Sequence, residues 1–198
     1  MRLRIGVFAS HGGSNMQAII DACRNGTIDG EVSVLICNNS KAYAVERAKA
    51  EGIPAYHLSS ANYPGQSDLD DAILLVLEKH KVNLVALAGY MKKIGPSVLN
   101  KYKNRVLNIH PALLPEHGGS GKFGRSVHES VIASGERESG ATVHLVNEKY
   151  DEGDILSQVV VQVKDNDTPE TLAERILPQE HRLYVETLRR ISSGELKI

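Results

Sequence analysis

The chain has 198 residues, with 23 Lys and Arg against 24 Asp and Glu and a formal net charge of -1. This length predicts one domain, or at most two small ones, and is sufficient to bury a core without disulfides or metals. The balanced charge argues against a nucleic-acid-binding protein, which would carry a basic stripe.

The sequence shows neither a membrane-spanning segment nor a secretory signal. No apolar run approaches the roughly 20 residues that cross a membrane, and the glycine-rich start of the chain is unlike a secretory signal. We therefore expect a cytoplasmic protein that uses no membrane, with its two cysteines, Cys23 and Cys37, present as free thiols.

The first half of the chain alternates strands with helices. Four apolar or extended runs are typical of strands: residues 3–9, 32–37, 53–58 and 84–88. Three segments of helical character lie between them: residues 16–22, 44–51 and 68–80. This order predicts an α/β fold with a mostly parallel, Rossmann-like twisted sheet, and a ligand site beyond the carboxyl ends of its strands.

The second half predicts a short strand, a helix, an antiparallel strand pair and a long closing helix. These elements are expected at residues 106–109, 126–134, 141–146 with 155–163, and 169–191. A glycine-rich loop at residues 115–125 precedes the first of the two helices, and the last helix is expected to be disturbed near Pro178. No linker or repeat interrupts the chain, so we predict a single domain over residues 1–198.

A glycine-rich turn follows the first strand and leads into the first helix. In this position, the backbone N–H groups of the turn at Gly13 can approach a phosphate, and Ser14 and Asn15 add side-chain donors. The turn matches neither a dinucleotide fingerprint nor a nucleoside-triphosphate loop, which favours a lone phosphate. The alternative is a tight turn in which Ser14 or Asn15 caps the helix, and the sequence alone leaves both open.

Asn108 and His110 are two residues apart on a predicted strand and therefore point to the same side. An amide can stabilise an oxyanion and an imidazole can move protons near neutral pH. A carboxylate beside the imidazole would raise its pKa, and Asp151, Glu152 and Asp154 are all candidates in one loop. The alternatives are a histidine that is merely hydrogen-bonded and a turn held by its own side chains.

Glu180 lies on an otherwise apolar helical stripe formed with Leu172, Ile176, Tyr184 and Leu188, so it faces inward unless Pro178 shifts the helical phase. It could receive a ligand amine or a buried arginine. The remaining histidines, His144 among them, have no cysteine or acidic neighbours at metal-ligand spacing, and we predict no metal site.

Taken together, these segments resemble the phosphoribosylglycinamide formyltransferase family of folate-dependent purine synthesis. The matching motifs cover nearly the whole chain in order: residues 13–20, 87–91, 107–115, 139–144, 151–153 and 179–181. An Asn-x-His-Pro segment with a downstream Asp-x-Gly is typical of the wider formyl-folate transferase and hydrolase superfamily. Within it, a hydrolase is expected to carry an additional N-terminal domain and a methionyl-tRNA formyltransferase a C-terminal one, so the length of this chain favours the glycinamide enzyme.

The resemblance implies transfer of a formyl group from 10-formyltetrahydrofolate, as co-substrate, to the amine of 5-phosphoribosylglycinamide. It implies a phosphate-binding half over about residues 1–105, with Gly13, Ser14 and Asn15 on the phosphate and Glu180 on the ribose. The other half, about residues 106–198, would be catalytic and folate-facing, with Asn108, His110 and Asp151 as the catalytic residues.

The implied folate contacts are Met91, Lys92, Lys93, Ile94 and Asn108. Gln66 stands where the family commonly has an arginine, and the resemblance leaves open whether it contacts the folate. The loop at 115–125 also departs from the family pattern, and we expect it to border the site and to move on binding. A non-catalytic phosphosugar-binding module remains an alternative, and the protein is expected to be a monomer or a homodimer.

Overall fold

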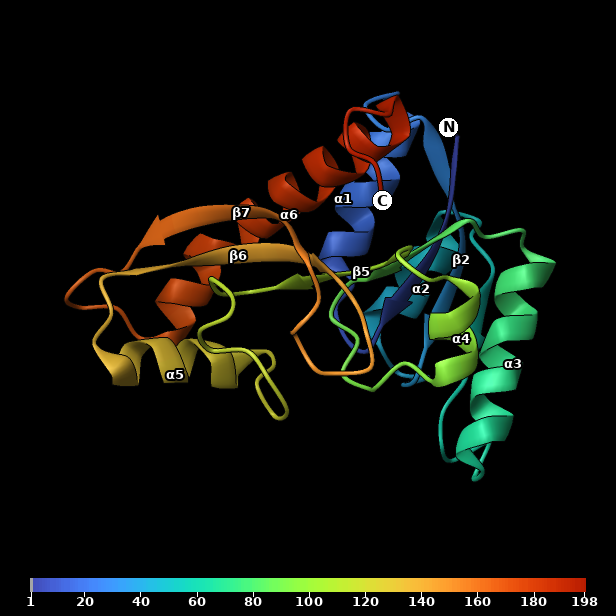
Figure 1. The fold of residues 1–198 in the computed structure, drawn as a ribbon, viewed down its shortest axis with the longest axis horizontal. Coiled ribbons are helices and arrows are strands. Elements are labelled where there is room, and N and C mark those ends of the chain that lie inside the picture. The colour runs from blue at the N-terminus through green and yellow to red at the C-terminus, as the bar shows by residue number, and fades with distance from the viewer. Residues whose placement is uncertain (1) are drawn as a thin grey trace.

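The computed structural model describes residues 2–198 and contains one seven-stranded sheet in the order β3-β2-β1-β4-β5-β6-β7 (Figure 1). The strands are β1 (Leu3–Ala9), β2 (Gly30–Cys37), β3 (Ala55–His57), β4 (Leu84–Leu87), β5 (Val106–His110), β6 (Glu138–Leu145) and β7 (Ile155–Gln162). The first five are parallel, whereas β6 runs antiparallel to both β5 and β7. The predicted fold class is confirmed.

Helices cover both faces of the sheet and make three layers. They are α1 (Ser14–Arg24), α2 (Tyr43–Ala50), α3 (Gln66–Lys79), α4 (Pro96–Lys101), α5 (Arg125–Ser134) and α6 (Pro169–Ser193). One core joins the sheet to α1, α2, α5 and α6, and a second core joins its other face to α3 and α4. Neighbouring residues of β1 serve opposite cores, since Val7 packs into the first and Phe8 into the second.

The order in which strands are added to the sheet reverses at β1. Strands β2 and β3 are added on one side of β1, and the chain then crosses to place β4 on the other side. Such a switch point leaves a crevice outside the carboxyl ends of the two central strands, where α/β proteins bind their ligands. Here the crevice lies between the turn after β1 and the segment after β4, which are joined by a 3.0 Å hydrogen bond from Ser10 N to Gly89 O.

Helix α6 begins at a reciprocal cap and ends at a glycine. The Thr168 side chain accepts from the Thr171 backbone, the Thr171 side chain accepts from the Thr168 backbone, and Pro169 occupies the first turn. The helix passes through Pro178 without losing its phase, because the residues of the predicted inward stripe are all buried: Leu172, Ile176, Glu180, Tyr184 and Leu188.

Two local expectations were wrong. The short helix α4 was not predicted, because its start depends on a residue far away in the chain: the buried Asp70 carboxylate accepts a hydrogen bond from Ser97 N at the first turn. Strand β6 begins at Glu138, earlier than the expected start at residue 141, and Ser139 pairs with Val161 of β7.

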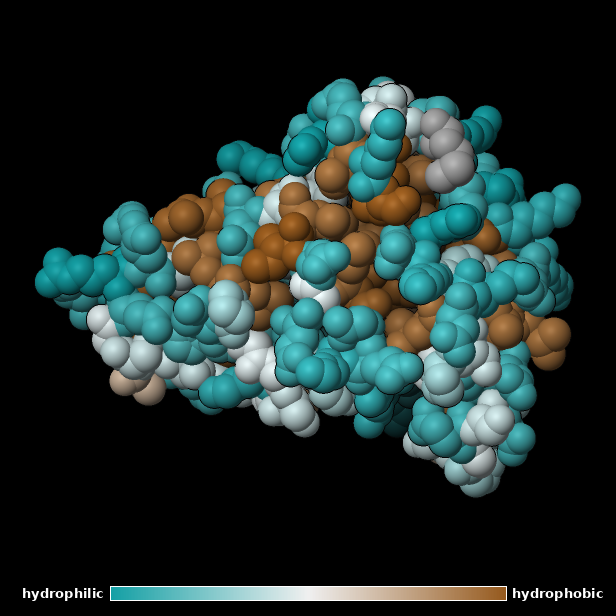
Figure 2. Space-filling view, in the orientation of Figure 1, coloured by the Kyte–Doolittle hydropathy of each residue, from teal (hydrophilic) through white to brown (hydrophobic). Residues whose placement is uncertain are grey.

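One edge of the sheet is the apolar strand β7. Ile155 and Val160 expose about half of their surface, at 45% and 53%. Figure 2 shows apolar side chains (brown) gathered over the region of β6 and β7 on the viewed face, with polar side chains around them.

Candidate active site

A cavity of about 810 Å³ lies beyond the carboxyl ends of β4 and β5. Nine of the residues predicted for the site line it: Asn15, Met91, Lys92, Lys93, Ile94, Asn108, His110, Asp151 and Glu180. Gly13 and Ser14 line a smaller adjoining hollow of about 150 Å³. Gln66 lies elsewhere: it is the exposed first residue of α3 and does not line the cavity.

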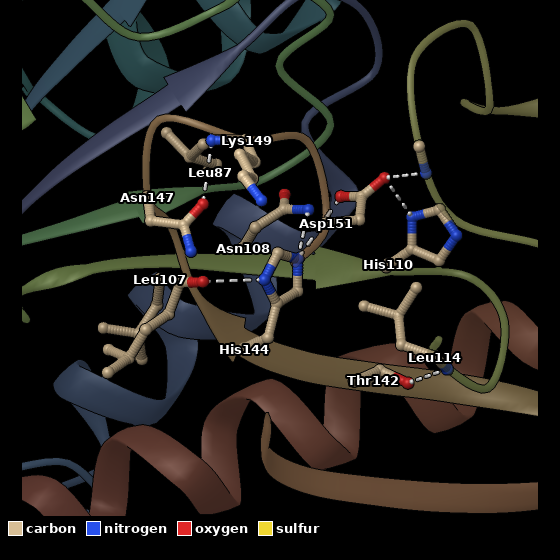
Figure 3. Close-up of polar contacts among 12 residues, drawn as sticks. Leu87, Leu107, Asn108, His110, Leu114, Thr142, His144, Asn147, Lys149 and Asp151 are labelled. Carbon is tan, nitrogen blue, oxygen red and sulfur yellow. Dashed lines mark hydrogen bonds and ion pairs between the residues drawn. The ribbon is translucent and has the colours of Figure 1, made fainter. Parts of the chain in front are cut away.

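Asn108, His110 and Asp151 converge on one wall of the cavity (Figure 3). Asn108 and His110 project from the end of β5, and Asp151 comes from the loop between β6 and β7. Asp151 Oδ2 lies 3.8 Å from His110 Nδ1, and Oδ1 lies 3.5 Å from Nε2 of His144. The three predicted side chains, distant along the chain, therefore line the same cavity, and Asp151 lies close to two imidazoles.

The loop between β6 and β7 selects one of the three candidate acids. The Asp151 side chain is 12% exposed and turned toward the histidines, whereas Glu152 is exposed and pairs with Lys149. Burial by itself raises the pKa of Asp151, but its interactions with His144 and His110 and the Gly119 N–H together outweigh burial and hold this pKa below its ordinary value. Asp151 is therefore an anion across the neutral range.

The pKa of His110 shifts in the direction opposite to the one expected from the sequence. Its side chain is 4% exposed, and burial lowers the pKa of His110 below its ordinary value, although Asp151 and the His117 carbonyl act in the opposite direction. The expected rise in this pKa is therefore not found. The ring also contacts the glycine-rich loop, since its Nε2 lies 3.1 Å from the His117 carbonyl oxygen.

His144 is a member of this cluster that the sequence did not single out. Strand β6 places it directly opposite Asn108 on β5. The Leu145 carbonyl, 2.8 Å from Nδ1, accepts the proton of that nitrogen, so that Nε2 is left to accept a 3.1 Å hydrogen bond from the Asn108 amide. His144 thus orients the Asn108 amide, and its ring lies beside the Asp151 carboxylate, whose Oδ1 is 3.5 Å from Nε2. The only signal in the sequence was a polar residue at the inward alternation of an apolar strand.

The smaller hollow lies at the N-terminus of α1. Gly13 is the N-cap residue, with φ of 69°, and no side chain caps the helix. The predicted alternative, a cap made by Ser14 or Asn15, is therefore wrong. The first backbone N–H groups of α1 have no partner within the helix, and together with the helix dipole they favour an anion at this end.

Asn15 and Glu180 join the two cavities. Asn15 Nδ2 donates a 2.9 Å hydrogen bond to Glu180 Oε2, while Asn15 Oδ1 is buried without a partner. The predicted arginine partner of Glu180 is wrong, because the Asn15 amide takes that place. Burial raises the pKa of Glu180 to about 7, because the single hydrogen bond from Asn15 only partly compensates for the loss of water.

The described residues hold no group of three His, Cys, Asp or Glu side chains arranged for a metal ion. Within residues 2–198, none of the helices is both long and apolar enough to cross a membrane. The side chains that line the cavity include an amide, imidazoles and a carboxylate, close to the N-terminal end of α1.

Residues 3–188 match the family model described as formyl transferase, and the chain belongs to this family. It is 44% identical to a chloroplastic phosphoribosylglycinamide formyltransferase of Arabidopsis thaliana, covering 99% of this chain and 68% of the relative. It is 35% identical to the phosphoribosylglycinamide formyltransferase of Bacillus subtilis, covering 95% of this chain and 94% of the relative. Within the family, the chain therefore belongs with the phosphoribosylglycinamide formyltransferases.

Solved structures agree with this assignment. The glycinamide ribonucleotide transformylase 1 of Symbiobacterium toebii superposes with a TM-score of 0.93 at 42% identity, covering all of this chain and 91% of that one. A formyltetrahydrofolate deformylase of Pseudomonas syringae has a TM-score of 0.89 at 22% identity, with 64% of its chain covered. This second likeness shows a shared fold alone.

Proposed function

We propose that the protein transfers the formyl group of 10-formyltetrahydrofolate to the amine of 5-phosphoribosylglycinamide, a step of purine synthesis. The products are formylglycinamide ribonucleotide and tetrahydrofolate. The observation that carries the proposal is the convergence of Asn108, His110 and Asp151 on a cavity that adjoins the hollow at the N-terminus of α1. Asn15, Gly89 and Met91 line both spaces, so one ligand can reach from the hollow to the convergent side chains.

The two substrates divide this space between them. The phosphate sits on Gly13, Ser14 and the first N–H groups of α1, and Glu180 accepts hydrogen bonds from the ribose hydroxyls. The folate takes the larger cavity along residues 91–94. Glu180 is suited to the ribose because a buried carboxyl with one partner has unused acceptor capacity.

The reaction needs the neutral amine as nucleophile. Its lone pair attacks the formyl carbon and forms a C–N bond, and the carbonyl electrons move to oxygen. Asn108 has two amide N–H groups and uses one toward His144, so the second can donate to that oxyanion. The developing negative charge, together with anionic Asp151, favours protonation of His110, which then donates to the same oxygen.

Collapse of the tetrahedral intermediate breaks the bond between the carbon and the folate nitrogen. The carbonyl re-forms, the folate nitrogen takes up a proton, and the former amine loses one. Asp151 is placed to order a water that relays this proton. His110 Nε2 first has to leave the His117 carbonyl, so the loop at 115–125 opens or shifts when the substrates bind.

The test is formyl transfer by the purified chain, followed as tetrahydrofolate formation with and without 5-phosphoribosylglycinamide. Product should form only when the amine is present. Formyl loss without the amine would support a hydrolase, and binding of both ligands without turnover would support a non-catalytic phosphosugar module. Asp151→Asn should abolish transfer, whereas the matched control Glu152→Gln, which changes the exposed neighbour in the same loop, should retain it.

A further inference from the structure

Helix α2 holds the glycine-rich turn after β1 from behind. Ala44 N donates a 3.0 Å hydrogen bond to the His11 carbonyl, and Arg47 Nε donates a 2.9 Å hydrogen bond to the Gly12 carbonyl. The turn also lies tightly against the helix, because a Cβ placed on Gly13 would come within 2.8 Å of the Ala44 Cβ. Two consecutive carbonyls are thereby turned toward α2.

This arrangement determines what the turn presents to the hollow. A carbonyl oxygen that faced the hollow would repel an anion, whereas a carbonyl bonded to α2 cannot rotate into it without losing its partner. The N–H groups of the first turn of α1 stay unpaired and available, since the first hydrogen bond within the helix runs from Gln17 N to the Gly13 carbonyl.

Arg47 also brings a charge that no carboxylate neutralises. In the described part of the chain, the neighbouring cation Arg24 pairs with Glu51, whereas Arg47 contacts a carbonyl, the Gln17 amide oxygen at 3.3 Å and the Tyr43 ring at 4.9 Å. Its charge also acts on α6: after burial, Arg47 is the second cause that lowers the pKa of His181.

We propose that Arg47 is a positioning residue for the substrate phosphate. It fixes the Gly12 carbonyl away from the phosphate and adds an unpaired positive charge behind the turn. This inference rests on the phosphosugar substrate of the proposed function and assigns a role to a residue outside both cavities. Arg47 does not touch the reacting atoms, so it should affect phosphosugar binding and leave the transfer step unchanged.

The test compares Arg47→Met and Arg47→Lys in steady-state formyl transfer. The Met variant should raise KM for the phosphosugar about 10- to 100-fold, the size expected for loss of a hydrogen bond from a charged group. Its kcat and its KM for the folate should remain within about twofold of the native values. Lys retains the charge and one donor, so it should restore part of the affinity. The control Arg24→Gln removes the neighbouring cation, which is paired with Glu51, and should change neither KM.

A second measurement separates a phosphate role from a general structural one. Calorimetry measures how tightly the native protein and Arg47→Met bind ribose 5-phosphate and unphosphorylated ribose. Arg47→Gln replaces the Met variant if that variant does not fold. Only the phosphorylated ligand should lose affinity. An unchanged affinity for ribose 5-phosphate, or an equal loss with both ligands, overturns the inference. Native protein that binds ribose 5-phosphate but transfers no formyl group would refute the proposed function instead.

Discussion

The buried carboxyl of Glu180 predicts a specific pH dependence of stability. The residue is 9% exposed, and burial raises its pKa to about 7 from an ordinary value of 4.5. In the unfolded chain the group ionises near its ordinary value, so the folded state is penalised progressively as pH rises from about 4.5 to about 7. The difference between these two pKa values corresponds to at most about 3 kcal/mol above pH 7.

Glu180→Gln removes this penalty while keeping an oxygen that can accept from Asn15. The variant should be close to the native protein in stability near pH 4.5 and more stable by about 2 to 3 kcal/mol at pH 8. Urea unfolding of both proteins at several pH values between 5 and 8 measures the gap. Glu174→Gln changes an exposed carboxylate of the same helix and serves as the control.

A gap between Glu180→Gln and the native protein that stays constant from pH 5 to pH 8 would refute the reasoning, because it would mean that the carboxyl is ionised in both states throughout. The same titration has a consequence for binding. Ribose hydroxyls that donate to Glu180 would favour its ionised form, so phosphosugar binding near pH 6.5 should release a proton. Calorimetry in two buffers of different ionisation enthalpy detects that release.

Four further outcomes concern the cluster at the end of β5. Asn108→Ala should lower kcat about 100- to 1,000-fold, the usual effect of losing one oxyanion donor, as measured by steady-state transfer. His110→Ala or Asp151→Asn should abolish turnover with phosphosugar affinity nearly unchanged by calorimetry; near-native activity in either variant would contradict the assigned roles. His144→Ala should lower kcat by ~100-fold through misplaced neighbours while both KM values hold, so a change confined to KM would count against it. Hydrogen exchange at Gly119, whose N–H donates to Asp151, should change when both ligands bind, and equal exchange with and without ligands would argue against loop movement.

Apart from α4, the order of elements could be predicted from the sequence because each of the others depends on local signals. Apolar or extended runs mark the strands, and α6 carries its own start in Thr168 and Pro169. The inward direction of Glu180 likewise follows from helical spacing alone. What these features share is that the deciding residues lie within a few positions of one another.

The remaining features depend on contacts between distant residues. Helix α4 starts where Asp70 accepts from Ser97, and Glu180 meets Asn15, which is 165 residues away. His144 joins the site only because the register of β5 and β6 sets it opposite Asn108. Spacing within the chain contains no information on that register. The lowered pKa of His110 depends on its burial, which composition does not reveal.

The most direct test is a crystal structure with 5-phosphoribosylglycinamide and a folate analogue that carries a non-transferable formyl mimic. We expect the Asn108 amide nitrogen and one nitrogen of the His110 ring to lie within about 3 Å of the formyl oxygen. The substrate amine should face the formyl carbon. We also expect the contact between His110 and the His117 carbonyl to be broken. Asn108 or His110 pointing away from that oxygen while both ligands are bound would contradict the proposed mechanism.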